Sequence, residues 1–213
     1  MAAASASAAP TDKDLTSIQE ARRLAQRAKQ VAPSLAEFTQ EQIDRIVDAM
    51  AAATRPRAEE FAKLAVEETT YGVVADKVEK NLFSSERVYE FIRPMRTVGV
   101  IRRDEERKVV EIAEPFGVVA AIVPSTNPTS TAIYKILISL KARCPIVISP
   151  HPSAARCITR VAEVMAEAAV KAGAPARRAA SSIASATALM HFTAAGWGLS
   201  TTAHRALIEI RIL

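Results

Sequence analysis

The 213-residue sequence has only two cysteines, Cys144 and Cys157, and no uninterrupted apolar run of the roughly 20 residues that span a bilayer. Two cysteines cannot form a disulfide framework, which favours a reducing compartment. Residues 1–14, rich in alanine and serine, lack the basic start and long apolar stretch of a secretory signal, so we expect a disordered tail there. These absences predict a cytoplasmic protein without a membrane segment.

A surplus of charge of one sign is also missing over most of the chain. The net charge is +5, but residues 1–173 hold 24 lysines and arginines against 22 acidic side chains. A nucleic-acid-binding surface needs clustered basic side chains with aromatic residues between them. Only 5% of the residues are aromatic, and the basic residues alternate with acids along predicted helices. We therefore expect no nucleic-acid partner.

The first half of the chain has helical periodicity. Apolar residues recur on one face across residues 15–32, and Thr39 with Gln42 has the spacing of a capping box that begins a second helix. A third helix should end near Gly72, and a fourth should span residues 76–93. The buried stripe of the second helix is predicted to be Ile43, Ile46, Val47 and Met50. Together these helices predict an N-terminal helical layer.

The period then changes to that of strands. Residues 98–101 and 108–113, joined by a charged turn, predict a β-hairpin. The nearly unbroken apolar run 116–123 predicts a parallel strand that is buried on both faces, and residues 145–148 predict a second strand. Helices are expected at 129–141 and 154–172.

This strand-helix-strand-helix order predicts a right-handed βαβ unit, whose ligands bind beyond the carboxyl ends of the strands. A polar corner follows each strand. Residues 124–131, PSTNPTST, offer hydroxyls, an amide and helix N-terminal N–H groups to an anionic or ribose-bearing ligand, and they suit a helix cap equally. In the second corner, SPHP at 149–152, His151 either shapes a turn or serves as an acid, a base or a polar contact.

Three stretches of the sequence carry a resemblance to a known family. DKVEKN at 76–81, TVGVI at 97–101 and the segment IAEPFGVVAAIVPSTNPTSTAIYKILISLKARCPIVISPHPSA at 112–154 resemble the CoA-acylating branch of the aldehyde dehydrogenase superfamily. The similarity covers about residues 15–175. It implies an α/β fold: an N-terminal helical layer, a β-hairpin, and the first βαβ unit of a Rossmann-like NAD-binding domain. That superfamily binds its cofactor without the GxGxxG motif, which is also absent here.

The resemblance implies NAD or NADP as cofactor, coenzyme A as co-substrate and a small aldehyde as substrate. Acetaldehyde, propionaldehyde and sulfoacetaldehyde all stay open. Thr126 falls where hydrolytic relatives place an oxyanion-stabilising amide, and Ser149 falls where they place a lysine near the adenosine ribose. No metal site is expected. The cofactor-binding residues that the resemblance implies are Pro124, Thr126, Asn127, Ser149, Pro150 and His151.

The family's catalytic cysteine belongs to a second domain that the resemblance does not reach. We expect Cys144 and Cys157 to be packing residues, so the chain looks truncated and inactive alone, with no catalytic residue assigned. Two alternatives stay open. One is a non-catalytic nucleotide-binding or subunit-interaction module, which forms a homo-oligomer or docks on a full-length relative. The other is a minimal thiol catalyst built from Cys157 and His151.

Residues 176–213 depart from the resemblance. They contain four arginines, a single acid and no lysine, aspartate or asparagine. This composition suggests an out-of-frame continuation or a diverged tail, and the short TALMH at 187–191 favours divergence. The glycines at 196–198 predict a flexible loop rather than a cofactor turn. The predicted organisation is thus a tail over 1–14, a partial NAD-binding domain over 15–175 and a second tail over 176–213.

Overall fold

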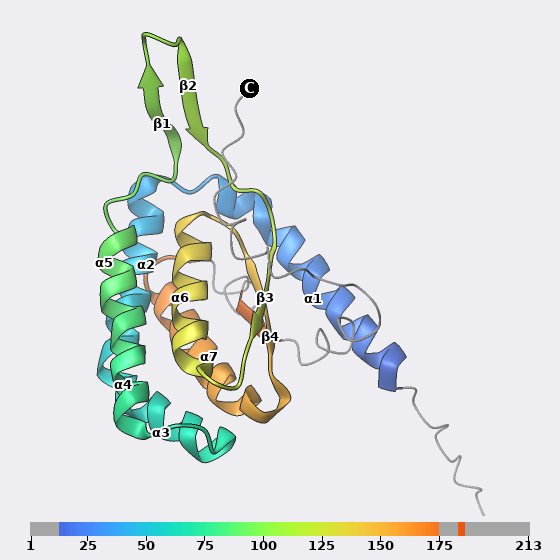
Figure 1. Cartoon of the computed structure of the whole chain (residues 1–213). Coiled ribbons are helices and arrows are strands. Elements are labelled where there is room, and N and C mark those ends of the chain that lie inside the picture. Colours follow the sequence, from blue (N-terminus) through green and yellow to red (C-terminus); the bar gives the residue numbers. More distant parts are fainter. Residues whose placement is uncertain (1–12, 175–182, 186–213) are drawn as a thin grey trace, which may run out of the picture.

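The computed structural model describes residues 13–174 and 183–185. A layer of helices is followed by a hairpin and by a small parallel sheet with its own helices (Figure 1). The layer comprises α1 (Lys13–Ala36), α2 (Gln40–Thr54), η1 (Arg55–Arg57), α3 (Ala58–Thr69), α4 (Val74–Leu82), the π-helical turn η2 (Phe83–Arg87) and α5 (Val88–Ile92). The other elements are β1 (Gly99–Asp104), β2 (Val109–Ala113), β3 (Val119–Val123), α6 (Pro128–Lys141), β4 (Ile146–Pro150), η3 (Pro152–Ala154), α7 (Ala155–Lys171) and β5 (Ile183–Ser185).

Helix α2 begins as the sequence predicts. Thr39 Oγ1 accepts a hydrogen bond from the backbone N–H of Gln42 at 3.2 Å, and Gln42 Oε1 accepts one from the Thr39 N–H at 2.9 Å. These two bonds complete the capping box. The predicted stripe is confirmed, because its four side chains are at most 1% exposed: Ile43, Ile46, Val47 and Met50. They belong to one core with side chains of α3, α6 and α7.

Other helix ends differ from the prediction by a few residues. Helix α1 continues beyond the predicted 15–32 through Pro33 to Ala36. Helix α3 ends as expected just before Gly72, since Thr70 takes a left-handed conformation with φ of 60°. The periodic apolar pattern therefore locates the helices well and their ends less well.

The predicted helix over 76–93 is present but is not regular. It begins at Val74, widens into the π-helical turn η2 and ends at Ile92. Within this stretch the Ser85 hydroxyl donates to the backbone oxygen of Asn81 at 2.9 Å. Such bonds from a serine to the preceding turn compete with helical hydrogen bonds and bend helices.

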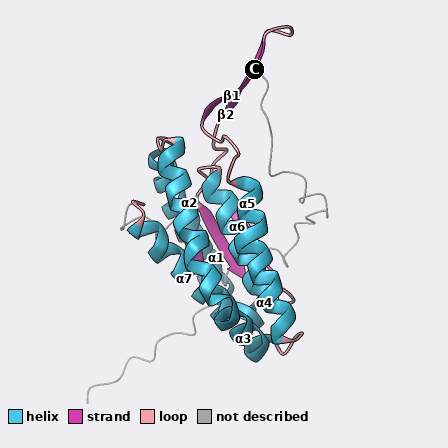
Figure 2. Ribbon diagram, turned by 90° about the vertical axis from the view of Figure 1, so that its left-hand side faces the viewer, coloured by secondary structure: helices cyan, strands magenta, loops and turns pink. Residues whose placement is uncertain are grey.

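Strands β1 and β2 form the predicted antiparallel hairpin, which projects beyond the helices (Figure 2). Gly99 pairs with Ala113 at its base. Arg143 holds this base, because its Nη2 donates to Ala113 O at 2.9 Å and its Nη1 donates to Ala36 O. The buried guanidinium therefore joins the end of α1, the end of β2 and the start of β4.

Strands β3 and β4 are adjacent and parallel, as the two apolar runs predict. Their register runs from Val119 opposite Ile146 to Val123 opposite Pro150, and α6 connects them. A parallel pair needs such a crossover. The predicted α/β architecture of helical layer, hairpin and βαβ unit is confirmed.

The two faces of the sheet are covered by different helices. On one face Ile146 and Ile148 join the core formed with α6 and α7. On the other face Val147 packs against Leu24 and Ala28 of α1. Strand β4 is buried along its whole length as a result.

The prediction for residues 116–123 is wrong in two respects. The strand starts later than the apolar run, because Gly117 has φ of 121°, a conformation open mainly to glycine, and Phe116 is 66% exposed. The strand is also not buried on both faces, since Ala120 and Ile122 are exposed. In the described sheet β3 is an edge strand, and α1 covers its neighbour β4 instead.

Residues 183–185 form β5, parallel to β4, where the sequence predicts no strand. The predicted tails otherwise lie outside the described residues, apart from Lys13 and Asp14, which begin α1. TALMH at 187–191 and the glycines at 196–198 also lie outside them. Within the described ranges, no helix is long and apolar enough to cross a membrane.

Candidate functional site

The two polar corners lie side by side at the carboxyl ends of β3 and β4, where ligands of such sheets bind. Val123 is opposite the buried Pro150 at the end of the register, and the backbone N–H of His151 donates to Val123 O at 2.9 Å. The chain therefore leaves the sheet at Pro124 and at His151 in neighbouring positions. The structure thus brings together the candidate residues of both segments, Pro124, Thr126, Asn127, Ser149, Pro150 and His151.

These candidates differ in accessibility. Pro124 and Thr126 are exposed, and Asn127 and His151 are half-buried. Ser149 is fully buried, and its Oγ has no hydrogen-bond partner within the described ranges. A buried hydroxyl without a partner is uncommon and destabilising. The hydroxyl of Ser149 therefore has unused hydrogen-bonding capacity.

Asn127 occupies the N-cap position of α6, and Pro128 follows at the first helical position. The cap interpretation of this corner predicts that the Asn127 side chain accepts a hydrogen bond from the first turn. It does not, because no side-chain cap hydrogen bond is present and Asn127 Oδ1 accepts from Lys80 Nζ at 3.0 Å. Asn127 thus stands where a capping residue would stand, but its side-chain oxygen accepts a hydrogen bond from a lysine of another helix.

Two lysines that the sequence analysis does not single out contact this corner. Lys77 Nζ donates to Thr126 O at 2.9 Å, and Lys80 Nζ binds the Asn127 amide. Lys77 is 4% exposed, and this burial, helped by the nearby charge of Lys80, lowers the pKa of its ammonium group. Both lysines belong to the DKVEKN stretch, and their i, i+3 spacing on one helix face is the signal that could have found them.

His151 acts here as a turn residue. Its Nδ1 accepts a hydrogen bond from the Ser153 N–H at 3.2 Å and lies 2.8 Å from Ser153 Oγ. The imidazole thereby caps the short η3 turn that leads into α7. Of the two interpretations left open for this histidine, these contacts support the structural one.

The surroundings of Cys157 disfavour a thiolate. Its side chain is fully buried and donates to Ala154 O at 3.3 Å. Burial, with a smaller contribution from the Glu68 carboxylate, raises the pKa of the Cys157 thiol to about 12. Glu68 also occupies the N-terminus of α7, because its carboxylate oxygens accept from the backbone N–H groups of Arg156 at 2.8 Å and Cys157 at 2.7 Å.

The α7 N-terminus, which would otherwise favour a thiolate, is thus neutralised by a carboxylate. Burial also raises the pKa of the Cys144 thiol. Both cysteines are buried, as expected of packing residues, and their surroundings disfavour the alternative of a thiol catalyst formed by Cys157 and His151.

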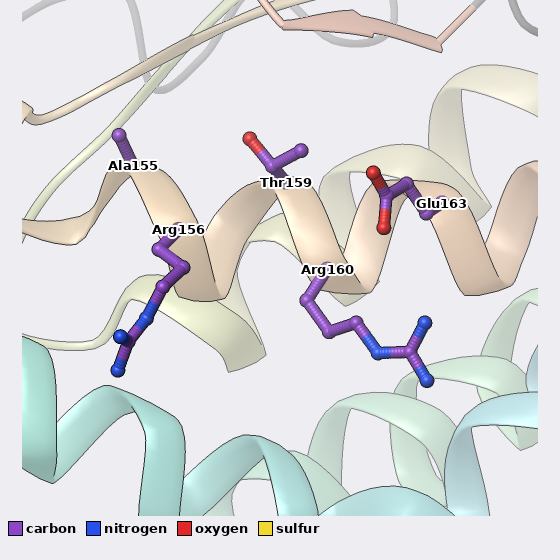
Figure 3. Close-up of a pocket in the computed structure, with 5 residues that line it drawn as sticks. All are labelled: Ala155, Arg156, Thr159, Arg160 and Glu163. Carbon is purple, nitrogen blue, oxygen red and sulfur yellow. The ribbon is translucent and has the colours of Figure 1, made fainter.

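A shallow hollow of about 390 Å³ lies along α7 (Figure 3). Two of its arginines form ion pairs with α3: Arg156 with Glu67 at 2.8 Å and Arg160 with Glu60 at 2.9 Å. No candidate residue lines it. Its lining residues are Ala155, Arg156, Thr159, Arg160 and Glu163. Among the described residues, no cluster of histidine, cysteine, aspartate or glutamate could hold a metal.

Comparison with known proteins identifies the family of the chain. The family model "Aldehyde dehydrogenase family" matches residues 7–178. The chain belongs to the aldehyde dehydrogenase family. The predicted resemblance is therefore confirmed.

The relatives of the chain include acylating enzymes, and the chain spans only part of their length. The bifunctional aldehyde-alcohol dehydrogenase of Escherichia coli is 45% identical over 76% of this chain, which spans 18% of that protein. An acetylating aldehyde dehydrogenase from Geobacillus thermoglucosidasius has 53% sequence identity to this chain, and its crystal structure matches with a TM-score of 0.77. The match covers 83% of this chain and 38% of the Geobacillus chain. An engineered glycolyl-CoA reductase with bound NADP⁺ is 22% identical with a TM-score of 0.64 and covers 77% of this chain and 36% of its own, which shows a shared fold.

Proposed function

We propose that this chain forms part of the NAD- or NADP-binding region of a CoA-acylating aldehyde dehydrogenase. The observation that carries the proposal is the placement of two polar corners side by side at the carboxyl ends of parallel strands, Val123 beside Pro150. In the complete reaction an aldehyde is oxidised and its acyl group passes to coenzyme A. The cofactor, when bound, accepts the hydride.

The residues at the corners fit a dinucleotide. The hydroxyl of Ser149 is without a partner in the described part of the chain but is fully buried, so a hydroxyl of the adenosine ribose would bind it only when the side chains over it move aside. The exposed Pro124 and Thr126 would border the nicotinamide, and Asn127 would offer its amide there. The contribution of these residues is to bind and orient the cofactor.

The described residues do not supply the nucleophile of this reaction. A thiolate must attack the aldehyde before hydride transfer, and burial raises the pKa of the Cys144 and Cys157 thiols, which disfavours the thiolate. We therefore assign the chain a cofactor-positioning role and expect it to be inactive alone.

Calorimetric titration of NAD into residues 1–213 tests the proposal. We expect weak binding that falls about five-fold in Ser149→Ala, the effect of roughly one hydrogen bond, and further in Thr126→Ala with Ser149→Ala. Ser139→Ala is the matched control, because Ser139 is also a buried serine whose Oγ lacks a partner in the described part of the chain. Equal affinities for the Ser149 and Ser139 variants, or tight binding that survives the double variant, would show that the cofactor binds elsewhere.

A subunit-interaction module is the second candidate, and the projecting hairpin favours it. Val110 and Ile112 of β2 are 45% and 48% exposed, and an isolated two-stranded hairpin is only marginally stable in water. A homo-oligomer, or a complex with a full-length relative, would cover these side chains. Light scattering of the native chain and of a Val110→Lys, Ile112→Lys variant tests this, since a monomeric native chain that binds no relative excludes it.

A further inference from the structure

Three residues on one face of α4 contact the corner between β3 and α6. Lys77, Lys80 and Asn81 have i, i+3 and i+4 spacing, which places their side chains together on a helix. Lys77 binds Thr126 O and Lys80 binds Asn127 Oδ1. The three side chains thus engage the backbone and side chains of the first polar corner, and we call them the α4 clamp.

Asn81 completes the α4 clamp and also fixes it to the rest of the helical layer. It is fully buried, its Nδ2 donates to Ala58 O at 2.9 Å, and its Oδ1 accepts from Thr129 Oγ1 at 2.8 Å. Every polar atom of the Asn81 side chain is therefore used. The clamp is a set of specific bonds between segments that are 47 to 49 residues apart.

Burial of the Lys77 side chain is energetically unfavourable. Its side chain is 4% exposed, and placing an ammonium group in such a position is unfavourable unless hydrogen bonds compensate. The bond that it makes is to the carbonyl oxygen of Thr126, and no ion pair of Lys77 is present among the described residues. An apolar side chain would fill the same space without this penalty, so the lysine is suited to fixing that carbonyl.

Lys80 determines how the Asn127 amide is oriented. A lysine has donors and no acceptor, so it can bind only the oxygen of the amide. With Oδ1 held at 3.0 Å, Nδ2 points to the other side with two donors. These donors have no partner within the described ranges, and Asn127 is half-buried rather than fully buried.

This arrangement replaces a stabilising one. An asparagine at the N-cap contributes about 1 kcal/mol when its oxygen accepts from the first turn of the helix. In this structure α6 has no side-chain cap, and the Asn127 amide oxygen accepts from Lys80 instead.

We propose that Lys77, Lys80 and Asn81 are positioning residues that hold the β3–α6 corner and set the Asn127 amide as a hydrogen-bond donor to a carbonyl oxygen of a bound ligand. The nature of that ligand rests on the proposed function, because both the nicotinamide carboxamide and an aldehyde carry such an oxygen. The orientation of the amide does not depend on that function.

The chain offers an unusually direct test, because Asn81 and Asn127 are its only asparagines. With ¹⁵N in the side-chain amides of asparagine, NMR of residues 1–213 should show two NH₂ groups. That of Asn81 should exchange slowly with solvent, and that of Asn127, assigned by its loss in Asn127→Asp, should exchange quickly. NAD and acetamide, an unreactive carbonyl compound, are the two probes.

We expect Lys80→Met to shift the Asn127 signals and to reduce their response to the probes at least five-fold, while the Asn81 signals stay in place and report an intact fold. Lys80→Arg should restore the native signals. Lys63→Met is the matched control, because Lys63 is an exposed lysine paired only with Glu59 among the described residues.

The outcomes separate the two proposals. Asn127 signals that are the same in Lys80→Met and in the native chain would overturn the clamp. If Lys80→Met shifts them but NAD does not affect the native chain, the clamp holds and the assignment of the cofactor fails. A response to NAD alone identifies the carboxamide as the ligand, and a response to acetamide alone identifies a substrate-type carbonyl. A native chain that responds to neither probe would overturn the donor role of Asn127.

Discussion

Replacement of Asn81 by alanine should destabilise the fold more than any single change at the surface of α4. Asn81 is fully buried and makes two side-chain hydrogen bonds, to Ala58 O and from Thr129 Oγ1. Thr129 is itself 2% exposed, so its hydroxyl would lose its acceptor in a place that water does not reach. Each buried polar group left without a partner costs about 1–3 kcal/mol.

From these two bonds we expect Asn81→Ala to lower the free energy of unfolding by about 2–4 kcal/mol. Urea denaturation followed by circular dichroism measures it as a lower transition midpoint at an unchanged slope. Thr129→Val is the companion change, because it removes the hydroxyl and keeps the shape of the side chain.

The double variant decides whether the two side chains act together. If Asn81 and Thr129 stabilise each other, the combined loss should be smaller than the sum of the single losses by about 1 kcal/mol. A loss below about 0.5 kcal/mol in Asn81→Ala, the size typical of surface changes, would contradict a stabilising role of the two buried hydrogen bonds. Strict additivity would refute the coupling.

Three further predictions concern other parts of the molecule. The buried ammonium of Lys141 forms an ion pair with Asp44. In urea denaturation, Asp44→Asn should lower the free energy of unfolding by about 3 kcal/mol and Lys141→Met by about 1 kcal/mol, because only the first change leaves the buried ammonium without its carboxylate. A larger loss in Lys141→Met than in Asp44→Asn would contradict this. Because the pKa of Cys157 is raised from 9.0 to about 12, its contribution to stability is complete below pH 9 and is lost as the pH rises towards 12. Cys157→Ala should flatten this decline, and an unchanged slope would contradict the assignment. Residues 1–213 should reduce no NAD with acetaldehyde, with or without coenzyme A, and turnover that disappears in Cys157→Ser would overturn that expectation.

Local patterns in the sequence predict most of the fold. The capping box of Thr39 and Gln42 is a local pattern, because its residues are three positions apart. The two apolar runs predict adjacent parallel strands. The start of β3 is missed because an apolar run does not distinguish a strand from the loop that precedes it. The unusual φ of Gly117 marks that boundary. Exposure of Ile122 could not be foreseen either, since it depends on which strand α1 covers.

The candidate site is less visible in the sequence because distant segments build it. The two corners can be located from their composition, since polar residues follow each apolar run. The lysines of the α4 clamp and the Glu68 carboxylate at the N-terminus of α7 act over 47 to 89 residues, and no local pattern encodes such pairs. The same limit applies to His151, whose role in a turn depends on how Ser153 is placed.

The placement of the cofactor is tested most directly by mapping where NAD binds on the uniformly ¹⁵N-labelled chain, with backbone amide signals followed during a titration. The largest shifts should fall on Thr126, Asn127 and His151, at the carboxyl ends of β3 and β4. Shifts that instead concentrate on Arg156 and Arg160, along the hollow of α7, would contradict the placement of the cofactor at the two corners.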